Sequence, residues 1–106
     1  MANSPLHVKK AISEAAQASA AWNSAGATVR FILSDPGIDV ILDPQGRETN
    51  AEPTHVMNIS WPDLKDIAEG RRSFLRSLTT QRFTARGPVL QTIAFGQALA
   101  TFELDH

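Results

Sequence analysis

The segment that most constrains the fold is the uncharged stretch after Pro88. Its apolar side chains, spread over residues 89–102, point in nearly every direction around a helix axis. The remaining polar face is thin and uncharged, formed by Gln91, Thr92, Gln97 and Thr101. The stretch is too short and too interrupted to span a bilayer. It therefore predicts a helix that is covered on more than one side.

Two interpretations of this helix remain open. In the first, it is buried between a sheet and a neighbouring helix or subunit. In the second, it is a lid with one face on the core and the other toward an apolar ligand. We expect Phe95 and Phe102 to contact a ligand or a partner surface more than the deep core, because one sheet cannot cover so many directions.

A short strand is expected just before this helix. Phe83 and Ala85 alternate with polar residues over 82–86, which is the period of a half-buried strand. Gly87 and Pro88 then form a turn. Pro88 suits a first helical turn, because its missing N–H would have no partner there.

The first half of the chain predicts one helix and a hairpin. Ser4 and Pro5 are typical of a helix start, and apolar residues at helical spacing continue it over about 5–23. Residues 28–34 and 38–43 then alternate with period two, joined by a type II turn at 35–37. We expect the helix to pack on the sheet.

A third strand and two short helices follow. Alternation over 54–61 predicts the strand, after a polar loop at 46–53. Ser60 and Asp63 form a capping box for the next helix, which Gly70 ends as a left-handed cap. Apolar positions over 74–78 indicate a further short helix.

Size and composition narrow the function classes. At 106 residues the chain is expected to be a single domain over 1–106. Its net charge of −1 gives no whole-molecule attraction to nucleic acid. With no cysteine, thiol chemistry and cysteine-ligated metals are excluded. No signal peptide or transmembrane segment is evident, so we expect a cytoplasmic protein.

Charge is unevenly distributed along the chain. Residues 35–69 hold eight acids, whereas residues 70–102 hold five arginines and no acid. One interpretation is that the two groups complement each other within the fold. The alternative is that Arg71, Arg72 and Arg76 meet an anionic headgroup or an acidic partner.

The search for catalytic and metal motifs finds none. There is no nucleophile elbow, phosphate loop or zinc-binding helix motif, so we expect no catalytic residue, metal or cofactor. His55 is interpreted as a strand-end histidine with a local partner or water, because no second ligand lies at metal spacing. The arginines lack the interleaved aromatics of a nucleic-acid surface.

The order of elements and two motifs resemble the sterol carrier protein-2 (sterol-binding) domain. The motifs are S-W-P-D-L-K-D-I-A-E-G at Ser60–Gly70 and R-F-T-A-R-G at Arg82–Gly87. The resemblance spans about residues 8–102. Pro88 stands where the family often has aspartate, and the polar loop replaces a glycine-rich insert.

The resemblance implies an α+β fold without enzymatic activity. A mostly antiparallel sheet of four to five strands, covered by helices, would enclose an apolar tunnel for a fatty acyl chain, a sterol or a similar lipid. The C-terminal helix would lie near its mouth. The expected ligand-binding residues are Phe31, Leu33, Met57, Ile59, Leu64, Ile67, Phe74, Leu75, Leu78, Phe83, Ile93, Phe95, Leu99 and Phe102.

Two other hypotheses remain. The chain could be an accessory or oligomerisation module whose apolar C-terminal helix packs on a partner, either a second copy or an enzyme. It could also be an enzyme that uses the same fold. Lipid that copurifies with the protein would favour the carrier over the module.

Overall fold

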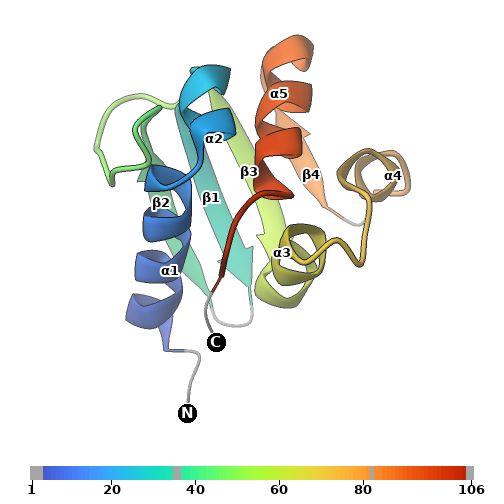
Figure 1. Cartoon of the computed structure of the whole chain (residues 1–106), viewed down its shortest axis with the longest axis horizontal. Coiled ribbons are helices and arrows are strands. Elements are labelled where there is room, and N and C mark those ends of the chain that lie inside the picture. Colours follow the sequence, from blue (N-terminus) through green and yellow to red (C-terminus); the bar gives the residue numbers. More distant parts are fainter. Residues whose placement is uncertain (1–3, 35–36, 82, 105–106) are drawn as a thin grey trace.

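The computed structural model describes residues 4–34, 37–81 and 83–104. Figure 1 shows the order of its elements. They are α1 (Pro5–Gln17), α2 (Ala20–Ala25), β1 (Val29–Ser34), β2 (Ile38–Leu42), β3 (His55–Ser60), α3 (Trp61–Ala68), α4 (Phe74–Thr79), β4 (Thr84–Arg86) and α5 (Val89–Leu99). None of the helices in these ranges is long and apolar enough to cross a membrane.

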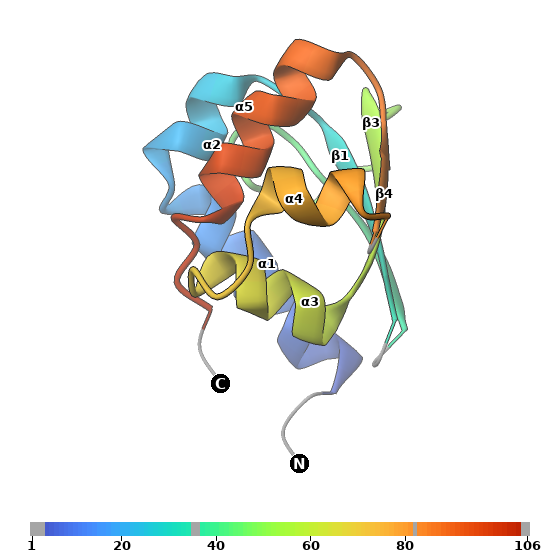
Figure 2. The same ribbon diagram turned by 90° about the vertical axis from the view of Figure 1, so that its right-hand side faces the viewer.

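The four strands form one sheet in the order β2-β1-β3-β4. The outer pairs are antiparallel and the central β1–β3 pair is parallel. Seen edge-on in Figure 2, the helices lie on one side of the sheet. This two-layer α+β arrangement, with a mostly antiparallel sheet of four strands, confirms the predicted fold class.

Alternation along the strands decides which face the helices cover. In β1 and β3 every second residue is buried, and Phe31 lies opposite Met57 in the parallel register. The other face carries exposed polar groups, among them Arg30, which bonds both oxygens of Asp39 at 2.8 and 2.5 Å. The Arg30 guanidinium keeps the pKa of Asp39 below its usual value.

The prediction of a single helix over 5–23 is wrong. The helix ends at Gln17, and Ser19 caps a second helix by accepting a bond from the Trp22 amide at 3.1 Å. The Ser19 hydroxyl also lies 2.8 Å from that of Thr101. A capping serine is favoured just outside a helix rather than within one, so Ser19 separates the two helices. The spacing of apolar residues alone does not reveal this break.

The other predicted helix ends are largely confirmed. Ser4 and Ser60 cap α1 and α3 by accepting bonds from amides three residues on, at 3.2 and 3.1 Å. Gly70 has φ 80°, and the amides of Gly70 and Arg71 bond to Ile67 and Asp66 at the end of α3. These two bonds define a Schellman cap.

The turn before α5 differs from the prediction, and part of the predicted hairpin turn lies outside the described residues. Pro88 is the N-cap of α5 rather than a residue of its first turn. The predicted type II turn includes residues 35–36, which lie outside the described residues, as does Arg82 of the predicted strand.

A chain of aromatic rings fills the space between the sheet and the helices. Trp22 contacts Phe31, Phe95 and Phe102, with ring centroids 5.9, 5.9 and 5.7 Å apart. Phe95 continues the chain to Phe74 at 6.1 Å. Because edge-to-face and offset contacts add to the burial of apolar area, this cluster is a principal part of the core.

The two tryptophans of this core differ in how their indole N–H groups are satisfied. Trp22 Nε1 donates to the backbone oxygen of Asp43 at 2.9 Å, which holds the loop after β2 against α2. Trp61 Nε1 is buried and meets no acceptor among the described residues.

We therefore expect Trp22→Phe to destabilise the protein by at least about 1 kcal/mol more than Trp61→Phe. Both changes shrink a buried ring, but only the first removes a hydrogen bond. Urea unfolding of the two variants measures the difference. Equal losses would show that the Trp61 N–H is satisfied after all.

Candidate functional site

A largely apolar cavity of about 270 Å³ lies where α3, α4 and α5 meet. Figure 2 shows the three helices side by side, with α4 between the other two. The cavity is lined by Ile67, Gly70, Arg72, Ser73, Phe74, Leu75, Ile93, Gly96, Gln97 and Ala100.

A close contact between α4 and α5 forms one wall of the cavity. The Phe74 ring lies against Gly96 in the middle of α5, where a β-carbon would overlap the ring. Phe74 also packs against Phe83, with ring centroids 5.2 Å apart. Glycine is unfavourable within a helix, so its place here is explained by the room it gives to this aromatic ring.

A second, polar hollow adjoins this cavity. It has a volume of about 480 Å³ and is lined by Arg71, Arg72, Ser73, Arg76, Ser77 and Thr80. Arg72 and Ser73 line both spaces. An apolar chamber therefore lies directly beside a cleft that carries positive charge, which we call the arginine cleft.

Acids in and just after α3 hold two of these arginines. Asp66 accepts bonds from Arg71 at 3.1 Å and from Arg72 at 3.2 Å, and Glu69 pairs with Arg71. The bonds from Arg71 and then Arg72 keep the pKa of Asp66 below its usual value, although burial opposes them. For this pair of arginines, the acidic and basic segments do complement each other within the fold.

Arg76 differs from its neighbours in the cleft. Within the described ranges it makes no ion pair, and its side chain is exposed. Of the three predicted headgroup residues, it is the one whose charge is not already balanced by an acid.

The structure divides the predicted ligand-binding residues into three groups. Four of them line the cavity: Ile67, Phe74, Leu75 and Ile93. Leu78 is half-buried against the core. The others are buried in the core, namely Phe31, Leu33, Met57, Ile59, Leu64, Phe83, Phe95, Leu99 and Phe102. The tunnel that the resemblance implied is not shown, since aromatic rings occupy the space between sheet and helices.

The expectation that Phe95 and Phe102 lie outside the deep core is wrong. Phe95 is fully buried and Phe102 almost so. The helix is apolar in many directions because α2, α4 and the sheet all cover it. The large apolar residues that α5 exposes are instead Val89 and Leu90, in its first turn.

Sequence reasoning missed several residues of the cavity, including Gly70, Ser73, Gly96, Gln97 and Ala100. Gly96 is the one with a usable signal, because a glycine inside a helical pattern commonly marks a close approach. Polar Ser73 and Gln97 carry no such signal, since they line the cavity only through the packing of α4 on α5.

His55 has the local partners that were predicted for it. It is buried, and its Nε2 lies 3.1 Å from the backbone oxygen of Pro88, while Nδ1 lies 2.7 Å from the Thr54 hydroxyl. A carbonyl only accepts, so Nε2 carries the proton and donates. No group of three potential metal ligands occurs in the described part of the chain.

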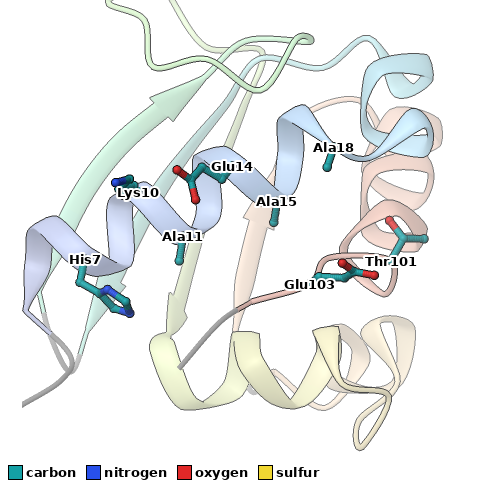
Figure 3. Close-up of a pocket in the computed structure, with 8 residues that line it drawn as sticks. All are labelled: His7, Lys10, Ala11, Glu14, Ala15, Ala18, Thr101 and Glu103. Carbon is teal, nitrogen blue, oxygen red and sulfur yellow. The ribbon is translucent and has the colours of Figure 1, made fainter.

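A third hollow lies along α1. Figure 3 shows it between α1 and the segment after α5, with a volume of about 410 Å³. Its lining combines small alanines with charged side chains, among them Lys10, Glu14 and Glu103. None of the predicted site residues lines it, and its mixed polarity suits an acyl chain less well than the cavity at α4.

Comparison with known proteins identifies the fold. No protein-family model and no curated protein matches the chain. Among solved structures, sterol carrier protein domain 2 of Helicoverpa armigera matches with a TM-score of 0.68 and 15% identity, covering 99% of each chain. Sterol carrier protein 2 of Yarrowia lipolytica, in its apo form, gives 0.61 and 18%, over 88% of this chain and 84% of that one.

The fold also occurs inside a longer protein. The sec-alkylsulfatase Pisa1 from Pseudomonas matches with a TM-score of 0.59 and 14% identity, over 81% of this chain but only 14% of the sulfatase. Together these structures show that the chain has the sterol carrier protein-2 fold, which confirms the resemblance found in the sequence.

We expect Gly96→Ala to destabilise the protein by about 1–3 kcal/mol, because the new methyl group overlaps the Phe74 ring. Adding Phe74→Leu should make the two effects non-additive by at least about 0.5 kcal/mol. The measurement is denaturant unfolding of both single variants and the double variant. Gln97→Ala, at an exposed position of α5, is the control. A stabilising Gly96→Ala would contradict the contact.

Proposed function

We propose that this protein binds a lipid with a single apolar chain and an anionic head, such as a fatty acid, and acts as a carrier rather than an enzyme. The apolar cavity between α3, α4 and α5 would hold the chain. The observation that carries the proposal is that this cavity shares Arg72 and Ser73 with the arginine cleft. An amphiphile needs this combination of adjacent environments.

Cavity size favours a flexible chain over a rigid sterol. Ligand pockets run from roughly 300 Å³ upward, and the cavity is slightly smaller at about 270 Å³. A flexible chain can enter progressively, whereas a fused ring system needs its full width at once. A longer chain requires α4 to move outward from α5. The sterol carrier names of the neighbouring structures support lipid binding in general.

Ligand binding is expected to stabilise the lipid-free protein. A fatty acid at about 100 times its dissociation constant should add roughly 2.7 kcal/mol to the free energy of unfolding. It should also slow hydrogen exchange over residues 89–99. Thermal unfolding and hydrogen exchange with fatty acids, the matching alcohols and sterols provide the test. If no apolar ligand stabilises the protein or protects the last helix, the carrier proposal fails.

A variant at the cavity mouth locates the site. Leu75 lines the cavity and is 48% exposed, so Leu75→Asp should leave the fold intact but weaken stabilisation by the ligand. Leu6→Asp is the matched control, because Leu6 is an exposed leucine on α1 that does not line the cavity. Equal losses from both variants would place the ligand elsewhere.

The arginine cleft indicates that the protein prefers a ligand with an anionic head. Asp66→Asn should remove the carboxylate that Arg71 and Arg72 share, leaving Arg71 with Glu69 and Arg72 with Asp63, and so raise affinity for a fatty acid relative to its alcohol, at low salt. Asp39→Asn is the matched control, since it releases Arg30 on the uncovered face of the sheet. Equal binding of acid and alcohol by the wild-type protein would contradict a headgroup role.

A partner module is the second candidate function. The observation that favours it is the match to a short part of the alkylsulfatase chain, which shows this fold as one part of an enzyme. In that case α5 would contact a partner protein, and no lipid would stabilise the isolated chain. The ligand panel above therefore separates the two candidates.

A further inference from the structure

The cavity between α3, α4 and α5 has a buried inner end and an exposed mouth. Among its lining residues, Ile67, Phe74 and Gly96 are buried, whereas Leu75 and Gln97 are exposed. We propose that the Phe74 ring closes the inner end and sets the longest apolar chain that the cavity accepts. This inference rests on the proposed function, because it names the residue that selects among the lipids bound there.

The Phe74 ring separates the cavity from the aromatic core. Its centroid lies 5.2 Å from that of Phe83 and 6.1 Å from that of Phe95, and both of these residues are buried. Phe95 in turn contacts Trp22 and His55. One side chain therefore stands between the cavity and the packed space that the sheet and the helices enclose. An acyl chain that enters from the mouth meets this ring before it reaches the core.

Gly96 fixes how far the ring can retreat from the cavity. A β-carbon at position 96 would overlap three carbon atoms of the Phe74 ring. Phe83 and Phe95 occupy other sides of the ring, and a close-packed interior yields only by displacing side chains. A larger residue at position 96 would therefore push the ring toward the cavity. The depth of the cavity is thus set by the contact between Phe74 and Gly96.

A ring that closes the cavity leaves a specific signature in lipid binding. Each methylene that leaves water should raise the affinity about fourfold. This gain ends at the methylene that meets the ring, because a further one either stays in water or forces α4 away from α5. Affinity should therefore rise with chain length and then level off. A residue that only stabilises the fold would change the affinities of all chains together and leave the levelling-off length unchanged.

The test is calorimetric binding of lipid-free wild-type protein and variants to saturated fatty acids of increasing length, each below the concentration at which it forms micelles. Phe74→Ala should move the levelling-off length to longer chains by at least about two methylenes, because the space of the ring becomes available. Phe74→Leu should move it in the same direction by less, and it provides the test if Phe74→Ala does not fold. Gly96→Ala should move it to shorter chains.

The control for these variants is Leu75→Ala, which shortens an apolar side chain at the mouth of the same cavity. It should lower the affinities of all chains by a similar factor and leave the levelling-off length where it is. A shift in Leu75→Ala as large as that in Phe74→Ala would overturn the inference, because the inner end would then have no special role.

Two further outcomes would overturn it. One is a levelling-off length that stays the same in both Phe74 variants, and the other is a shift to longer chains in Gly96→Ala. The failure of the proposed function is a different result: wild-type protein that binds no fatty acid of any length, in which case this inference falls with it. Binding by the wild-type protein without a shift in the Phe74 variants contradicts this inference alone.

Discussion

The burial of Phe95 is the interaction on which the rest of the structure depends. Its ring meets Trp22 of α2, Phe74 of α4 and, at 5.1 Å, His55 of β3. One side chain thus joins α5 to three other elements. Truncating such a residue costs about 3–5 kcal/mol, a large part of the 5–15 kcal/mol that stabilises a typical domain. Because only one face of the sheet is covered, the helices must all share this core.

The site lies at the edge of that shared core. Phe74 belongs to both, since its ring contacts Phe95 on one side and lines the cavity between the helices on the other. Glycine at 96 lets α4 approach α5 closely at one point. The cavity lies beside this contact, between α3, α4 and α5. The position of the cavity is therefore set by the packing of aromatic rings. The arginine cleft lies beside it, because Arg71 and Arg72 directly follow Gly70 at the end of α3 and Arg76 lies on the next helix, α4.

Local patterns in the sequence were sufficient for much of the fold. Alternation located the strands, and the chemistry of Ser60 and Gly70 located the ends of α3, because both signals are confined to a few neighbouring residues. The break at Ser19 was missed, because its hydroxyl is used by both a cap and a distant threonine. Phe95 was misplaced for a related reason: a sequence shows that a helix is apolar, but not how many neighbours cover it.

The same limit applies to the site. Ile67, Phe74, Leu75 and Ile93 were found as apolar residues of helices, without any means of separating them from core residues such as Leu64 or Leu99. Only the packing of α4 on α5 makes that separation. The pairing of Arg71 and Arg72 with Asp66 was open to either interpretation, because charge along a chain does not specify which side chains meet.

The bond between Ser19 and Thr101 joins positions that are 82 residues apart. Trp22, close to this bond, has two of its ring contacts with Phe95 and Phe102 near the other end of the chain. During synthesis the ribosome releases Trp22 and Phe31 long before the aromatic rings that cover them. The growing chain must therefore carry an unsealed hydrophobic surface until α5 emerges, so protection by a chaperone is most valuable before α5 has been synthesised.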